Sequence, residues 1–245
     1  MRSRALYRNG DTVVMDEVID GQRIRSLYVG GTWQSAVYLN PLKRNQPVFE
    51  YFKVMDAILR WKDPFRSGLM IGGGMYTFPR ILVNRNQDLH MDVCEINPDF
   101  EKLAMRYFLL GEAKDNITTY LMDGREYLEQ TKKSYDVIIH DAFEGRNLVR
   151  SLITLEGIQV VKQHLKKDGV YLINHHGYKM LDSSGDLLVT AATLRRCFEH
   201  VRLFQAAPEN YEVIRCNWVV LAGDGDLDVF GNIPDAPDLN QIRYD

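Results

Sequence analysis

Apolar and polar residues alternate in the first part of the chain. Three runs within residues 11–39 show this pattern, "TVVMDEVID", "QRIRSLYV" and "TWQSAVYL", and glycine turns separate them. A period of two between turns is typical of antiparallel strands, so we predict a small β-meander of about three strands. Such a sheet buries little apolar surface and is too thin to be stable alone.

The pattern takes on a helical period after residue 46. Apolar side chains recur at helical spacing over residues 47–61, and Pro47 stands near the start of this segment. From residue 67 onward, short apolar runs alternate with helical segments. The expected strands are residues 67–71, 89–96, 116–123, 135–143, 170–176, 200–206 and 217–223, and the expected helices are residues 77–85, 98–110, 124–131, 154–165 and 184–199.

This alternation predicts the fold class. Strands that alternate with helices form right-handed βαβ units and a mostly parallel sheet. The last two strands have no helix between them, which predicts an antiparallel pair at one edge. We therefore expect an α/β, Rossmann-like catalytic domain over residues 46–222, preceded by a small N-terminal β-domain over residues 1–45. Residues 223–245 are rich in Asp, Pro and Gly and are expected to form an irregular acidic tail.

Composition and charge narrow the class of protein. A chain of 245 residues suffices for one α/β domain with a small addition. A formal net charge of −3 with interspersed signs offers no basic surface for nucleic acid. No apolar run approaches the roughly 20 residues that span a bilayer, and the start of the chain lacks a signal peptide's apolar core. Three widely spaced cysteines favour reduced thiols, so we expect a cytoplasmic protein without a membrane segment.

Glycine or acidic residues follow four of the predicted strands, at the carboxyl ends where parallel sheets bind ligands. Each of them alone also fits a plain turn or a helix cap. Their recurrence at successive strand ends is what points to a ligand site. They are Gly72, Gly73 and Gly74 after the first strand, Glu95 at the second, Asp123 and Gly124 at the third, and Asp141 at the fourth.

The glycine loop, "GGGMYT", narrows the class of ligand. It lacks the third glycine of a dinucleotide site, and no Lys-Ser or Lys-Thr pair follows it, which excludes a P-loop. Glu95 can accept hydrogen bonds from ribose hydroxyls, and Asp123 can accept one from an adenine amine. Because no pyrophosphate need be cradled, these residues favour an adenosyl-sulfonium nucleoside over NAD.

The ordered series "LMIGGGMY", "VCEIN", "LMDGREYL", "YDVIIHDAFEG" and "SLITLEGIQVVKQHLKKDGVYLIN" resembles the motifs of the spermidine synthases. It is most similar to their bacterial spermidine-synthase-like branch, and the resemblance covers roughly residues 11–222. It implies a class I methyltransferase-like fold and the transfer of an aminopropyl or related alkyl group from decarboxylated S-adenosylmethionine to a small polyamine-like amine, with methylthioadenosine as product. It also implies a homodimer, and the apolar helix at residues 47–61 would suit such an interface.

The resemblance implies a role for each matched residue. Gln34 in "GTWQS" would contact the nucleoside, Glu95 would bind the ribose, and Asp123 would bind the adenine. Asp141 would be the catalytic carboxylate, which attracts the acceptor amine and accepts its proton. Glu144, one turn later, would help to hold that amine.

The chain departs from the family at the residue after the glycines. Met75 replaces the acidic residue that pairs with the donor's ammonium, and Glu50 and Tyr51 stand where the family has a Tyr–Gln acceptor pair. We expect Met75 to lie beside the donor tail and to admit ordinary S-adenosylmethionine; the alternative is that it packs under the loop. A methyltransferase and a non-catalytic nucleoside-binding homologue therefore remain as alternative functions.

The histidines add no metal site to this picture. His175 and His176 have no cysteine or histidine at metal-ligand spacing, so we expect no metal cofactor. His140 precedes Asp141 and faces either the cleft or the core.

Overall fold

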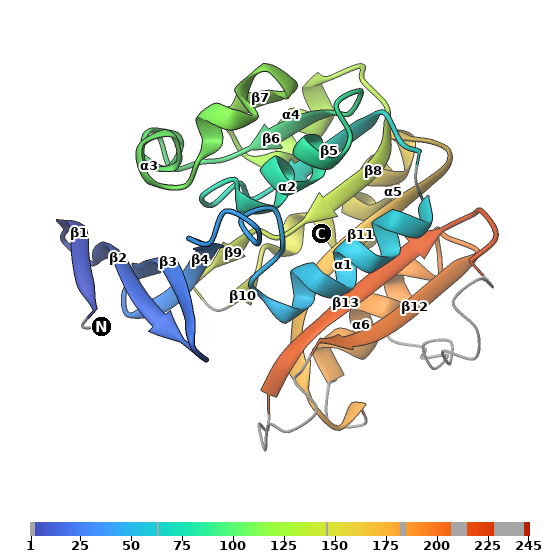
Figure 1. Ribbon diagram of the computed structural model, residues 1–245. Helices are drawn as coiled ribbons and strands as arrows, with labels where there is room; N and C mark the ends of the chain where they lie inside the picture. The colour runs from blue at the N-terminus through green and yellow to red at the C-terminus, as the bar shows by residue number, and fades with distance from the viewer. Residues whose placement is uncertain (1–2, 63, 146, 182–184, 207–214, 228–242) are drawn as a thin grey trace.

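The computed structural model describes residues 3–62, 64–145, 147–181, 185–206, 215–227 and 243–245. These residues form a four-stranded antiparallel sheet near the N-terminus, a seven-stranded sheet and a small hairpin (Figure 1). The first sheet comprises β1 (Arg4–Asn9), β2 (Thr12–Ile19), β3 (Gln22–Val29) and β4 (Thr32–Tyr38). The second comprises β5 (Ser67–Ile71), β6 (His90–Cys94), β7 (Ile117–Tyr120), β8 (Tyr135–His140), β11 (Leu165–Tyr178), β12 (His200–Ala206) and β13 (Arg215–Gly223), and the hairpin comprises β9 (Phe143–Glu144) and β10 (Asn147–Leu148).

The seven-stranded sheet is doubly wound. Its order is β12-β13-β11-β8-β5-β6-β7, and the strands from β11 to β7 are parallel to one another. β13 runs antiparallel to both of its neighbours, as the missing helix between β12 and β13 predicts. The strand order reverses beside β5, so the carboxyl ends of β5, β6 and β8 open a crevice at this point.

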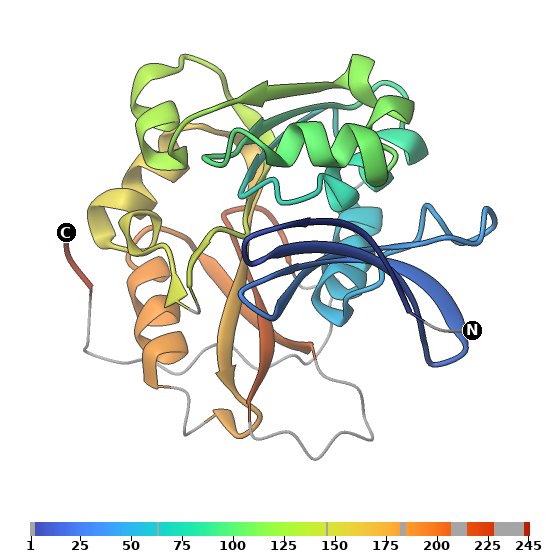
Figure 2. The same ribbon diagram turned by 90° about the vertical axis from the view of Figure 1, so that its left-hand side faces the viewer.

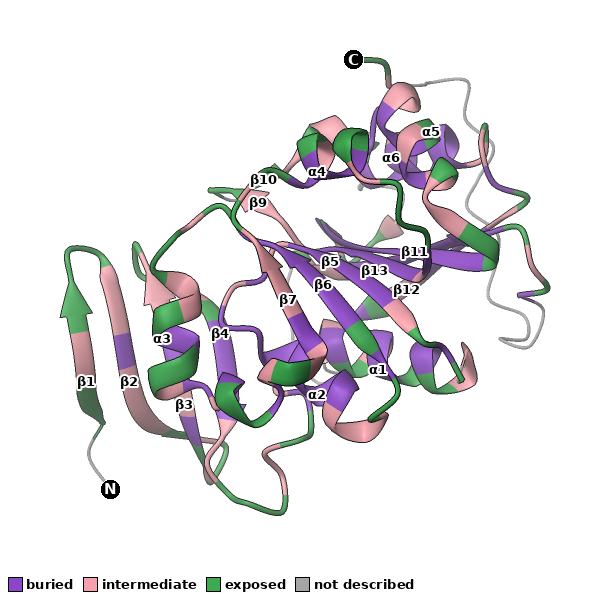
Figure 3. Cartoon of the chain, turned by 90° about the horizontal axis from the view of Figure 1, so that it is seen from above, coloured by how far each residue is buried: buried purple, intermediate pink, exposed green. Residues whose placement is uncertain are grey.

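Helices cover both faces of this sheet (Figure 3). Apolar side chains of α1, α2 and α3 pack in one core with the N-terminal sheet, and those of α4, α5 and α6 pack in a second core on the opposite face. The helices are α1 (Glu50–Lys62), α2 (Thr77–Arg85), α3 (Phe100–Tyr107), α4 (Gly124–Gln130), α5 (Leu155–Gln163) and α6 (Gly185–Leu194), with short 3-10 turns at Leu110–Glu112, Lys114–Asn116 and Arg150–Leu152.

The N-terminal sheet is stabilised by packing on the main domain rather than by itself. Its inner residues Val14, Leu27 and Val37 are buried in the same core as α1 and α2. Arg25 of β3 also donates a hydrogen bond to the carbonyl oxygen of Tyr107, at 3.0 Å. The dark blue strands lie at the side of the domain away from α6 (Figure 2). Four strands replace the three predicted, because β1 pairs with β2 although its sequence alternates poorly.

The described part of the chain contains no helix long and apolar enough to cross a membrane. Its three cysteines are free thiols, and Cys94 is buried. Most of the predicted tail lies outside the described residues. Arg243 and Asp245 contact the main domain, where the carbonyl of Arg243 accepts from Leu155 and Asp245 binds Arg125.

Candidate active site

The glycine loop after β5 is fixed between two neighbouring strand ends. Gly72 donates its backbone N–H to the carbonyl of Cys94 at 3.0 Å, and Asp141 donates to the carbonyl of Ile71 at 2.8 Å. Gly72 has a φ of 92°, and a Cβ at this position would overlap the carbonyl oxygen of Asp141. Glycine is required here for both reasons, and the loop can therefore pass close to any ligand in the crevice.

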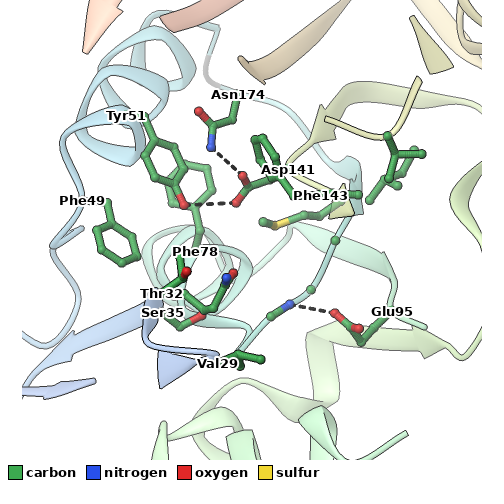
Figure 4. A pocket seen from close by; sticks show the side chains of 18 of the residues that line it. Val29, Thr32, Ser35, Phe49, Tyr51, Phe78, Glu95, Asp141, Phe143 and Asn174 are labelled. Carbon is green, nitrogen blue, oxygen red and sulfur yellow. Dashed lines mark hydrogen bonds between the residues drawn. The ribbon is translucent and has the colours of Figure 1, made fainter. Parts of the chain in front are cut away.

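Glu95 connects β6 to this loop. Its Oε2 accepts from the N–H of Gly74 at 2.9 Å (Figure 4). Its Oε1 accepts from the N–H of Asn97 at 2.8 Å. The side chain is only 7% exposed, and desolvation raises its pKa, although the backbone donors oppose this shift. Each carboxylate oxygen has a further lone pair, so Glu95 can accept from ribose hydroxyls while it holds the loop.

Asp123 and Gly124 begin α4 at the third strand end. Asp123 is the N-cap, and its Oδ1 accepts from the N–H groups of Arg125 and Glu126 at 2.8 and 3.1 Å. The capping role is therefore real, yet Asp123 also lines the same cavity as Glu95. A Cβ on Gly124 would overlap Ile71, so glycine lets α4 start against β5.

The N-terminal sheet contacts the glycine loop on the side opposite the strand ends. Ser35 of β4 accepts from the N–H of Met75 at 3.2 Å. The neighbouring Gln34 is exposed and lines the cavity, where the resemblance places a nucleoside contact.

Asp141 lies at the end of β8 with both carboxylate oxygens bound. Asn174 donates to Oδ1 at 2.7 Å, and the Tyr51 hydroxyl donates to Oδ2 at 3.2 Å (Figure 4). Desolvation raises the pKa of Asp141 from an ordinary 3.8 to about 7, although the hydrogen bonds from Asn174 and Tyr51 oppose the rise. A carboxyl group with this pKa exchanges its proton readily at neutral pH, which suits a general base.

One cavity of about 1010 Å³ is lined by Gln34, Ser35, Tyr51, Gly72, Gly73, Gly74, Glu95, Asp123, Gly124, Asp141 and Asn174. This volume lies at the upper end of the range for small-molecule sites, so a nucleoside and a second reactant fit together. Part of the cavity wall is aromatic. It includes Phe49, Tyr51, Phe52, Phe78 and Phe143.

Two predicted site residues do not reach this cavity with their side chains. Met75 is fully buried in the core shared with α1 and α2 and is not among the lining residues, so it packs under the loop. Tyr76 follows it with a left-handed φ of 56°, where the chain turns into α2. Glu144 is exposed in β9, and its neighbour Phe143 lines the cavity instead. Successive strand residues point to opposite sides, so Glu144 does not flank Asp141 as expected.

Three residues of the hydrogen-bond network around Asp141 were not predicted as site residues, and Tyr51 among them stood out only as a departure from the family. Tyr51 comes from α1, Asn174 from β11 and Asn217 from β13, and Asn217 donates to the Oδ1 of Asn174 at 2.7 Å. Asn174 carried one signal, because it is a polar residue in the apolar run "VYLIN" next to the strand of Asp141.

The histidines separate into core and cavity residues. His140 is buried and faces away from the cavity, with its Nδ1 2.9 Å from the Tyr171 hydroxyl, and desolvation lowers its pKa to about 3. His175 is buried against Thr190, while His176 lines the cavity and stacks on Phe143. The described residues contain no group of three or more side chains that could hold a metal ion.

Comparison with known proteins identifies the family. The model of the spermine/spermidine synthase domain matches residues 59–214. The chain belongs to this family. It is 30% identical over 215 residues to an N-terminal histidine N-methyltransferase of Emericella nidulans, and the aligned region covers 80% of this chain and 37% of that protein. It is 30% identical over 161 residues to a polyamine aminopropyltransferase of Chromobacterium violaceum, which covers 64% of this chain and 60% of that protein.

The fold agrees with this membership. A crystal structure of spermidine synthase in complex with the transition-state analogue AdoDATO superposes with a TM-score of 0.69 at 17% identity, covering 97% of this chain and 82% of that one. The predicted α/β, class I methyltransferase-like fold and the family resemblance are therefore confirmed. The chain spans less than two thirds of the length of both relatives.

Proposed function

We propose that the protein binds an S-adenosyl-type nucleoside and transfers an alkyl group from its sulfonium to an amine. The observation that carries this proposal is Asp141, a carboxylate held by Tyr51 and Asn174 in the cavity that the glycine loop also lines. The two relatives are named as a methyltransferase and an aminopropyltransferase, and the fold neighbour was crystallised with the analogue AdoDATO; these findings support an adenosyl-sulfonium donor.

The donor would lie along the strand ends. Glu95 would accept from the ribose, Asp123 would accept from the adenine amine, and Gln34 would approach the nucleoside from β4. Gly72, Gly73 and Gly74 allow the backbone to lie close to the sulfur side. In this arrangement the sulfonium carbon would lie towards Asp141, where the acceptor would attack in line.

Asp141 would then prepare the acceptor. An amine with a pKa near 10 is mostly an ammonium at neutral pH and cannot attack. Ionised Asp141 attracts the ammonium and accepts its proton as the nitrogen attacks the carbon, while the C–S bond breaks to give a neutral thioether. Since Asp141 must be ionised, we expect activity to rise with pH through about 7.

Methyl transfer is a second candidate, favoured by the position of Met75. The donor tail has no acidic partner at this position, because Met75 is buried in the core and Glu144 is turned away. A polyamine carries several ammonium groups, whereas an acceptor with one amine or imidazole nitrogen needs only one carboxylate. The Emericella nidulans relative is named for the second kind of acceptor. Ordinary S-adenosylmethionine would be the donor in that case.

Donor competition separates these functions. Calorimetric titration of S-adenosylmethionine, its decarboxylated form, methylthioadenosine and NAD tests the binding site. Mass spectrometry of reactions with polyamines and with histidine peptides then reports methylthioadenosine for alkyl transfer from the decarboxylated donor or S-adenosylhomocysteine for methyl transfer. Binding of NAD alone would contradict the proposal, and nucleoside binding without turnover would support the non-catalytic alternative.

A further inference from the structure

Three polar side chains form a line across neighbouring strands. Asp141 follows β8, Asn174 lies in β11, and Asn217 lies in β13. Asn217 pairs with His176, two residues from Asn174, so the two asparagines share a face of the sheet. Asn217 Nδ2 lies 2.7 Å from Asn174 Oδ1, and Asn174 Nδ2 lies 2.7 Å from Asp141 Oδ1.

The chemistry of the groups fixes the direction of these hydrogen bonds. An ionised carboxylate can only accept, so Asn174 must present its NH₂ group to Asp141. Its Oδ1 then points towards β13 and needs a donor, because Asn174 is only 2% exposed. Asn217 supplies that donor. Without Asn217, no group on the β13 side would favour this orientation of the Asn174 amide. The amide could then rotate by 180°, which would point its Oδ1 at the carboxylate of Asp141.

We propose that Asn217 is a positioning residue, which acts through Asn174 to keep a hydrogen-bond donor on Asp141. This inference rests on the proposed function for its catalytic meaning. Asn217 touches Asn174 and not Asp141 itself, so its effect on the carboxylate is indirect. Loss of the donor would leave Asp141 protonated up to a higher pH.

The other groups near Asp141 allow this effect to be isolated. The titratable or charged residues that line the cavity from the elements around Asp141 are Glu50 and Tyr51 on α1, Cys94 on β6 and Glu95 after it, Asp123 before α4, His176 on β11, and Arg215 and Cys216 on β13. Asn217 is neutral, and leucine is similar in size. Asn217→Leu therefore removes the donor and leaves each of these charges in place.

The test is a double-mutant cycle read by carboxyl ¹³C NMR titration of the full chain without donor or acceptor. Asp141 is identified by the signal that Asp141→Asn removes. Loss of a hydrogen bond to a charged group corresponds to a rise of about one pH unit in the Asp141 midpoint, which we expect in Asn217→Leu and in Asn174→Leu. The double variant should equal Asn174→Leu alone. Asn84→Leu on α2, outside the cavity, is the matched control and should leave the midpoint unchanged.

Additive shifts, or an unshifted midpoint in Asn217→Leu, would overturn the relay. Asn174→Ala replaces the leucine variant if that one does not fold, because the cycle needs only loss of the amide. The kinetic readout is independent: the acid limb of kcat should move to higher pH by the same interval in Asn217→Leu, with the Kd for methylthioadenosine unchanged. An NMR shift without any alkyl transfer would support the relay and reject the proposed function, so the two failures differ.

Discussion

Replacing Asp141 by asparagine should stabilise the protein while it removes activity. Asp141 has a folded-state pKa of about 7 against an ordinary 3.8, so ionising it costs folding free energy. This free-energy cost of ionisation is absent below the ordinary pKa of 3.8 and reaches its full size above the folded-state pKa of about 7. The substituted amide would keep the local hydrogen bonds, since an asparagine side chain can accept from Asn174 and donate to the Tyr51 oxygen.

The size of the effect follows from the shift. A rise of about three units corresponds to about 4 kcal/mol, and residual solvation of this half-buried group reduces the figure to about 2–4 kcal/mol. The stabilisation of Asp141→Asn should therefore be about 2–4 kcal/mol at about pH 8.5 and about two fifths as large at about pH 5. Turnover should fall by roughly 10²–10⁴-fold if Asp141 is the general base.

Denaturant unfolding at both pH values measures the difference in free energy of unfolding. Asp136 in β8, the strand that Asp141 follows, provides a control of opposite sign. Burial alone would raise the pKa of Asp136, but the N–H groups of Arg66 and Ser67 outweigh burial and hold it below its usual value. Asp136→Asn should therefore destabilise the protein at neutral pH. If Asp141→Asn is less stable than wild type at about pH 8.5, or if the gap does not widen with pH, the assignment of a strained carboxylate is wrong.

Three further outcomes are expected. Methylthioadenosine at about 100 times its Kd should add roughly 2.7 kcal/mol to wild type and nothing to Glu95→Ala, as thermal shift will show. Met75→Asp should cost several kcal/mol, because the side chain is 0% exposed, whereas Met75→Leu should cost less than about 1.5 kcal/mol; equal melting temperatures would contradict the buried position. Tyr51→Phe removes a donor from Asp141 and should move the acid limb of kcat to higher pH; an unmoved limb would separate Tyr51 from the base.

The order of strands and helices could be predicted because local patterns determine it. The apolar runs and glycine or proline punctuation gave most elements near their observed bounds, including the antiparallel β13. The misses depend on pairing partners that are distant in sequence. β11 begins at Leu165 rather than at residue 170, because Leu165 pairs with Tyr135 across an irregular register. The hairpin of β9 and β10 is too short to leave a pattern.

Self-association illustrates the same limit. The apolar face of residues 47–61 suggested a subunit contact, yet Phe52, Met55, Ile58 and Leu59 of α1 are buried within the chain itself. Helical periodicity reports that a face is covered, not what covers it. The homodimer remains a prediction, and the buried apolar side chains of α1 no longer support it.

The two ends of the site differ in how far sequence could define them, and the reason is physical. The proposed donor end is built from backbone features at strand ends, namely a positive φ at Gly72, a close approach at Gly124 and a cap at Asp123, and each leaves a local residue signature. The proposed acceptor end is built from side chains that α1, β11 and β13 bring to the neighbourhood of Asp141, and no local pattern links them. A change such as Met75, beside the glycine loop, can therefore be recognised in the sequence as a departure from the family. Its effect depends on how the side chain packs, which the sequence does not show. The geometry around Asp141, rather than the motif series, is what an acceptor must fit.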